Sequence, residues 1–166
     1  SRPELGSSLW ETILEAGRSE NIRPGSPNII DRVEAGLLSF GNEMTVENTP
    51  LECNMDKFLD INKEADYIGK KVLQRQIRYG IKRRIRGVIY NGPKLPTISR
   101  PLQVFDIDKR TIVGSLTSGA FSPHFKRNIG VGMIKYGYWD NNKKILVNIA
   151  DQEFREGLIK DLPLIQ

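Results

Sequence analysis

The stretch Asp31-Arg-Val-Glu-Ala-Gly-Leu-Leu-Ser-Phe-Gly-Asn-Glu43 joins a helical pattern to a glycine turn. Apolar residues recur in it at helical spacing, which predicts a helix that continues through Leu38 with one apolar face. Gly36 lowers helix propensity, so we expect close packing against a neighbouring element at that point. Phe40 and Gly41 then predict a turn that presents Asn42 and Glu43.

Three helices are expected in the first 80 residues. Ser8-Leu-Trp-Glu11 fits a capping box and predicts a helix that stops near Gly17, with Trp10 in the core. Ser26 and Pro27 suit the cap and first turn of the helix that carries Asp31. Asp66 is expected to cap a third helix that ends near Gly80. The region from Met44 to Ile61 predicts a loop with a short strand near Phe58 to Ile61.

The pattern changes after Gly80 from helical spacing to short alternating runs. Such runs, punctuated by Gly, Pro, Asn and Asp, predict an antiparallel barrel or sandwich. The expected strands are Arg84 to Tyr90, Leu102 to Ile107, Thr111 to Thr117, Asn128 to Ile134, Ile145 to Ile149 and Glu153 to Ile159. The fold class is therefore α+β, with one unit at 1–80 and a β-barrel at 81–166.

Composition is that of an ordinary globular protein of 166 residues, 39% hydrophobic and with a net charge of +5. No apolar run approaches the roughly 20 residues that span a bilayer. One cysteine, Cys53, and the lack of a Cys/His cluster argue against a disulfide or a metal site, and favour the cytoplasm. The basic cluster from Lys82 to Arg86 is interpreted as a solvated strand edge, so no nucleic acid is expected.

Arg32 and Glu34 are the first candidate site residues. Their side chains diverge by about 200 degrees around a helix, so we do not expect them to pair with each other. A guanidinium suits a planar anion or a polar ring edge, whereas the structural alternative is a salt bridge. Glu34 has an equal structural alternative, because a buried glutamate can hold nearby backbone amides.

Two aromatic residues and the single histidine are the remaining candidates. Phe40 can pack beside a flat ligand or in the core. Trp139 can stack on a ligand or plug the end of the barrel. His124 lies in a Ser-Pro turn without a nucleophile or a carboxylate at a motif spacing, which argues against catalysis. No phosphate loop or dinucleotide fingerprint is present. Residue patterns alone therefore predict a helical segment and a barrel, with one candidate anion-binding arginine, and no specific activity.

The order of motifs resembles the folate-dependent aminomethyl- and methyltransferases, the family of the glycine cleavage T-protein. Its Arg-Leu-Glu-Ala-Gly helix and Tyr-Gly-Asn-Asp/Glu turn correspond to Arg32–Gly36 and Phe40–Glu43, with phenylalanine in place of the tyrosine. The other segments that resemble the family are Asn48-Thr-Pro-Leu-Glu52, Tyr67-Ile-Gly-Lys70, Arg83-Arg-Ile-Arg-Gly87, Gly114-Ser-Leu-Thr-Ser-Gly119 and Ser122-Pro123.

The resemblance implies tetrahydrofolate as cofactor, with Arg32, Glu34, Phe40 and Trp139 as cofactor-binding residues. It implies no catalytic residue in this chain, because family members are about twice as long and their catalytic aspartate lies in the N-terminal half. That missing half is the expected partner, and a homodimer is a candidate assembly. Ser26-Pro-Asn28, Ser122-Pro-His-Phe125 and Trp139 resemble the branch of the family that demethylates dimethylsulfoniopropionate.

Two alternatives stay open beside the demethylase branch. One is the aminomethyltransferase of the glycine cleavage system, which acts on a lipoyl-bound aminomethyl group. The other belongs to a different class, a non-catalytic barrel that binds a partner or RNA through its basic face.

Overall fold

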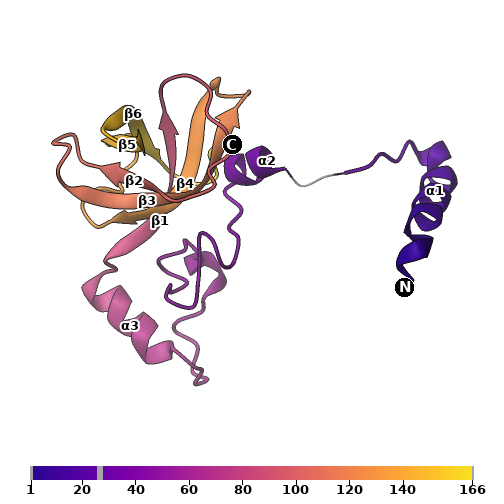
Figure 1. Ribbon diagram of the computed structural model, residues 1–166. Coiled ribbons are helices and arrows are strands. Elements are labelled where there is room, and N and C mark those ends of the chain that lie inside the picture. The colour runs from indigo at the N-terminus through magenta and orange to yellow at the C-terminus, as the bar shows by residue number, and fades with distance from the viewer. Residues whose placement is uncertain (1, 26–27, 166) are drawn as a thin grey trace.

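A computed structural model describes residues 2–25 and 28–165 (Figure 1). Its α-helices are α1 (Gly6–Ala16), α2 (Ile29–Glu34) and α3 (Lys70–Tyr79), with 3-10 turns at Pro3–Leu5, Arg18–Glu20 and Asp56–Phe58. Its strands are β1 (Arg83–Tyr90), β2 (Leu102–Phe105), β3 (Ile112–Ser122), β4 (Arg127–Lys135), β5 (Lys144–Ala150) and β6 (Glu153–Lys160).

The six strands form one closed antiparallel barrel in the order β1-β4-β3-β2-β5-β6. β1 closes it, because Val88 lies opposite Gly130 of β4 on one side and Ile159 of β6 on the other. The predicted α+β class, a helical segment followed by an antiparallel barrel, is confirmed.

Strand alternation divides the apolar residues between two cores. The barrel interior is filled by buried Val88 and Tyr90 of β1 together with residues from the other five strands, among them Leu116, Ile134 and Ile159. The opposite face of the β1 and β4 wall, with Ile85 and Ile129, packs against Val33 of α2. Figure 1 shows α2 beside the barrel, next to the C-terminus.

Gly132 is required where β3 and β4 approach each other. A Cβ atom at this position would lie 1.8 Å from the carbonyl oxygen of Ser115. Any larger residue would therefore push these two strands apart.

Helix α2 is shorter than the apolar pattern predicts, because it ends at Glu34 and not at Leu38. Gly36 adopts a φ of +67°, a left-handed conformation that terminates helices. Its Cβ position also lies 3.0 Å from Leu162 Cβ, so the expected close packing occurs at a helix end. Asn28 caps the start of α2 by accepting the Asp31 amide at 2.9 Å, while the expected cap Ser26 and first-turn Pro27 lie outside the described residues.

Two other local predictions in the first 80 residues are wrong. Helix α1 begins at Gly6 and not at a Ser8 cap, and Trp10 is 52% exposed and not in the core. The expected strand near Phe58 is instead the short 3-10 turn at Asp56–Phe58. Much of this region is loop, so its helical content is lower than the sequence suggested.

Helix α3 begins at Lys70, three residues later than an Asp66 cap would place it. The Lys70 ammonium donates to three backbone carbonyls, those of Lys63, Glu64 and Ala65, at 2.6, 3.2 and 3.1 Å. All three of its donors are thereby used to hold the preceding loop. Gly69, with a φ of +89°, provides the bend between that loop and the helix.

Over the described ranges of the chain, no helix is both long enough and apolar enough to cross a membrane.

Val33→Ala tests how much the α2–barrel contact stabilises the fold. Val33 is fully buried, so the loss of two methyl groups should lower the free energy of unfolding by about 1 to 3 kcal/mol. Urea titration followed by circular dichroism measures this change. Val46→Ala is the matched control, because Val46 is 86% exposed. Equal losses in the two variants would contradict the packing role of Val33.

Candidate functional site

Arg32 forms a bidentate ion pair with Glu43. Its Nη1 and Nη2 atoms lie 2.9 and 3.2 Å from the two carboxylate oxygens. Nη1 also donates to the Leu37 carbonyl at 2.9 Å, and Nη2 donates to Ser118 Oγ on β3 at 2.6 Å. Both terminal nitrogens of the guanidinium are therefore committed within the protein. Such fork-shaped pairing fixes orientation as well as charge.

Glu43 is the buried partner, with a side chain that is 0% exposed. The Ser39 amide donates to its Oε2 at 2.7 Å, and Asn42 Nδ2 donates to its Oε1 at 3.2 Å. Burial by itself would raise the pKa of Glu43. Hydrogen bonds from Arg32, Ser118 and the Ser39 amide outweigh burial and hold the pKa of Glu43 below its ordinary value of 4.5.

Ser118 connects this group to the barrel. Its Oγ accepts from Arg32 and, at 2.6 Å, from Asn42 Nδ2, and its own proton can be donated to Glu43. We call Arg32, Asn42, Glu43 and Ser118 the Arg32–Glu43 cluster. It joins a helix, a turn and a strand through polar contacts alone.

The turn held by this cluster presents Phe40 to solvent. Gly41 has a φ of +88°, and its amide donates to the Met44 carbonyl at 2.8 Å, which closes the turn. Phe40 is 69% exposed, so the structural alternative of a core phenylalanine does not apply to this chain. An aromatic face held outward by a rigid turn is suited to a flat ring.

Glu34 points to a different part of the barrel wall. Ser122 Oγ donates to its Oε1 at 2.5 Å, and the Phe125 amide donates to the same hydroxyl at 3.0 Å. The Glu34 carbonyl also accepts the Leu164 amide at 2.8 Å. The prediction that Arg32 and Glu34 do not pair is confirmed, because the two side chains reach β3 on either side of Val33.

Trp139 lies in another cluster, at the start of β1. Its carbonyl accepts from Arg86 Nε at 2.8 Å, the Arg84 guanidinium lies 5.9 Å from its ring, and Tyr136 packs edge-on at 5.2 Å. Its side chain also packs against the interior core of the barrel. Within the described residues, no hydrogen bond or aromatic contact joins Trp139 to Arg32 or Phe40.

Arg86 shows how closely this second cluster is packed. Its side chain is largely buried, and Nη1 forms an ion pair with Asp161 at 3.1 Å. Burial lowers the pKa of the Arg86 guanidinium, partly offset by the Asp161 charge.

Sequence reasoning identified Arg32 and the turn but did not assign a role to Glu43 or Ser118. Glu43 is the last residue of the Asp31–Glu43 stretch. It lies eleven positions after Arg32, and that spacing predicts an ion pair only if the turn between them is known. Ser118 is 86 positions from Arg32 in the chain. Its only sequence signal was its place within the Thr117-Ser-Gly119 segment. His124 contacts Phe125, with ring centroids 4.8 Å apart, and joins neither cluster.

The chemistry available here is binding and positioning. The Arg32–Glu43 pair neutralises itself, and Phe40 offers an apolar face. Across residues 2–25 and 28–165, no three His, Cys, Asp or Glu side chains gather closely enough to hold a metal ion.

The fold is a β-barrel domain in which six strands close on themselves and helix α2 is held to the outer wall. One protein family has a sequence profile that matches this barrel. The profile of the glycine cleavage T-protein C-terminal barrel domain matches residues 83–162. A solved aminomethyltransferase T of the glycine cleavage system from Bartonella henselae has the same fold, with a TM-score of 0.74 at 20% identity. The alignment covers 98% of this chain and 44% of that one.

Curated relatives extend the similarity upstream of the barrel. The chain is 41% identical over 136 residues to the dimethylsulfoniopropionate demethylase of Ruegeria pomeroyi, which covers 82% of this chain and 36% of the relative. It is 32% identical over 160 residues to an aminomethyltransferase of Geobacillus sp., covering 95% of this chain and 43% of the relative. The chain belongs to the glycine cleavage T-protein family of aminomethyltransferases, and it spans about two fifths of the length of these relatives.

Glu43→Gln tests the cluster. The change removes a charge that receives several hydrogen bonds, so we expect a loss of about 1.5 to 3 kcal/mol in the free energy of unfolding at pH 7. Because the pKa of Glu43 is lowered on folding, its contribution is full above the unfolded value near 4.5 and is lost as the pH falls through the folded pKa. The difference between the native chain and the variant should therefore shrink with acidification below about pH 4.5.

Urea titrations between pH 7 and pH 3 measure this dependence. Glu47→Gln is the control, because Glu47 is exposed. A difference that stays constant over the whole range would argue against a charged, hydrogen-bonded Glu43.

Proposed function

We propose that this chain is the C-terminal half of a tetrahydrofolate-dependent methyltransferase that demethylates dimethylsulfoniopropionate. The observation that carries the proposal is the 41% identity to a demethylase of that name, compared with 30 to 38% to seven aminomethyltransferases. The exposed Phe40 beside a self-neutralised ion pair is compatible with a flat, largely uncharged ring as ligand.

In this proposal the pteridine of tetrahydrofolate packs on Phe40. Arg32 and Glu34 position that face from behind, since their side chains bind Glu43, Ser118 and Ser122 of this chain. Trp139 belongs to the second cluster, where Arg84 and Arg86 lie beside it. Its contribution to the cofactor site stays a prediction of the family resemblance.

The proposed reaction needs orientation more than acid catalysis. The methyl carbon passes from the sulfonium sulfur to N5 of tetrahydrofolate. The carbon–sulfur bond breaks with its electron pair staying on sulfur, so the leaving group is a neutral thioether. The proton of N5 is lost from the methylated amine. Holding N5 in line with the methyl carbon is therefore the main task of the protein.

A further part of the enzyme is needed for this task. Several apolar side chains of the described region lie exposed, including Leu9, Trp10 and Ile13 of α1. The relatives are more than twice as long as the part that this chain matches. We propose that an N-terminal half, corresponding to their additional length, packs on these surfaces and supplies the catalytic groups. The 166-residue chain alone should then be inactive.

The aminomethyltransferase reaction is the second candidate, and it is favoured by the 95% coverage of this chain in the Geobacillus relative. It would give 5,10-methylenetetrahydrofolate and require a lipoylated carrier. A non-catalytic barrel is the alternative of another class. The proposal also includes a cytoplasmic location and a candidate homodimer, both of which are expectations from the sequence.

Co-expression with the N-terminal part of the Ruegeria pomeroyi demethylase tests the reaction. We expect 5-methyltetrahydrofolate and methylmercaptopropionate from dimethylsulfoniopropionate, with no requirement for a lipoyl carrier and no turnover by either half alone. Mass spectrometry of the folate products measures the outcome. Formation of 5,10-methylenetetrahydrofolate from an aminomethylated carrier, without demethylation, would assign the chain to the second candidate.

Phe40→Ala tests the cofactor face in the same reconstituted enzyme. Stacking of a flat ring on an aromatic side chain contributes about 1 to 3 kcal/mol, so the Kd for tetrahydrofolate should rise by about 5- to 150-fold. Because Phe40 is exposed, the Tm of the chain should not change. Phe58→Ala is the matched control, since Phe58 is also largely exposed. Equal effects on the Kd in both variants would remove Phe40 from the site.

A further inference from the structure

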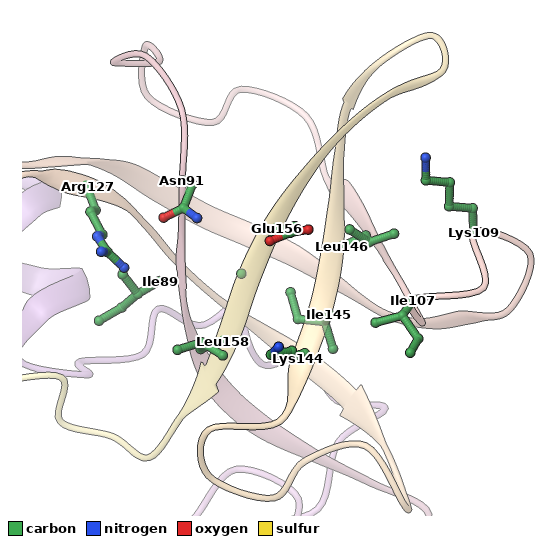
Figure 2. Close-up of a pocket in the computed structure, with 11 residues that line it drawn as sticks. Ile89, Asn91, Ile107, Lys109, Arg127, Lys144, Ile145, Leu146, Glu156 and Leu158 are labelled. Atoms are coloured by element: carbon green, nitrogen blue, oxygen red, sulfur yellow. The ribbon is translucent and has the colours of Figure 1, made fainter.

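A groove crosses the outer wall of the barrel on the side of β5 and β6 (Figure 2). It has a volume of about 320 Å³, and its lining runs from Arg127 at the start of β4 to Lys109 in the turn after β2. Figure 2 shows Arg127, Asn91 and Ile89 on one side of β6, and Ile107 and Lys109 beyond β5. The groove is separate from the Arg32–Glu43 cluster, which lies against β3.

Strand order gives the direction and length of this groove. Ile89 lies opposite Leu158, and Leu158 lies opposite Lys144, so the lining residues follow one row across β1, β6 and β5. The row from β4 to the turn after β2 crosses four strand spacings of about 4.8 Å, or about 19 Å in all. An extended segment of about six residues has this length.

The floor of the groove is apolar. Leu146 is buried, Ile89 and Leu158 are half-buried, and Ile107 is 67% exposed at one end. Exposed apolar side chains that continue a partly covered floor are a common feature of binding surfaces.

The rim of the groove is mainly basic. Lys109 and Arg127 mark its two ends and Lys144 its middle, whereas Glu156 is the single acidic lining residue. In the part of the chain that the structure describes, no salt bridge joins Glu156 to any of these three cations. Lys109 lies 5.7 Å from the Phe154 ring, a contact that leaves its charge in place.

We propose that this groove binds an extended acidic segment of a partner protein, with apolar side chains on the floor and carboxylates at the two ends. The apolar floor sets the contact area, and the basic ends provide charge complementarity and orientation. A nucleic acid would use the cations but not the apolar floor. A small anion would occupy one end of the groove and leave the other empty.

The test uses the full 166-residue chain and the fluorescein-labelled peptide Asp-Glu-Leu-Thr-Leu-Glu-Asp. Fluorescence anisotropy should show saturable binding that weakens as salt is added. The same peptide with serine in place of both leucines, and one with lysine in place of all four acidic residues, should each bind at least about tenfold more weakly.

Charge reversal locates the site. Arg127→Glu together with Lys144→Glu should raise the Kd for the acidic peptide at least about tenfold. The control is Arg100→Glu together with Arg110→Glu, which makes the same change in net charge at exposed positions outside the groove lining. Circular dichroism should show an unchanged fold in both double variants.

Several outcomes would overturn the proposal. They are absence of saturable binding, equal weakening by the two double variants, and equal affinity for the leucine and serine peptides. Binding of a single-stranded oligonucleotide in place of the peptide, with the same dependence on Arg127 and Lys144, would assign the groove to a nucleic acid. Dimerisation in sedimentation velocity that is lost on reversal of Arg127 and Lys144 would assign it to a second copy of the chain.

Discussion

The ion pair between Arg32 and Glu43 is the contact on which the arrangement of the turn after α2 against the barrel depends. One guanidinium holds the segment just after α2 through the Leu37 carbonyl, the following turn through Glu43 and the barrel through Ser118. Removing either charge would leave the other partly buried without a partner, which is far more costly than the net gain from a typical surface pair. Phe40, which is 69% exposed, lies on the turn that this pairing holds against the barrel.

Alternation in the barrel sequence was sufficient to predict that all six strands exist, because one face of each strand must enter a shared core. The expected strand Thr111 to Thr117, however, ends five residues before β3 does. The expected strand Arg84 to Tyr90 differs from β1 by a single residue. Helix ends were less predictable. Gly36 was expected to mark close packing inside a helix, yet it both ends α2 and packs on Leu162, and spacing alone does not separate these roles. The apolar side of α1 likewise predicted burial of Trp10 without specifying what covers it.

The candidate site, like the fold, has features that the sequence could predict and others that it could not. Residue type and position were enough to single out Arg32 and its turn, and the spacing of Arg32 and Glu34 was enough to predict that they do not pair. The partners of both side chains depend on tertiary structure. Ser118 and Ser122 lie on one face of β3, far along the chain from α2, so their contacts follow from barrel closure and not from local pattern. Trp139 was grouped with Phe40 by family resemblance, whereas the structure places it with Arg84 and Arg86.

Barrel closure restricts how another protein can join this chain. Each described strand has neighbours on both sides, and the portion of β1 that β6 does not reach is occupied as well. There the Ile85 amide donates to the Glu52 carbonyl at 2.7 Å, and Asn54 Nδ2 donates to the Ile85 carbonyl at 3.0 Å. With its main-chain groups used in this way, β1 offers no template for an added strand. Another polypeptide that associates with this part of the wall must therefore bind through side chains, so its specificity depends on surface residues that can change without disturbing the barrel.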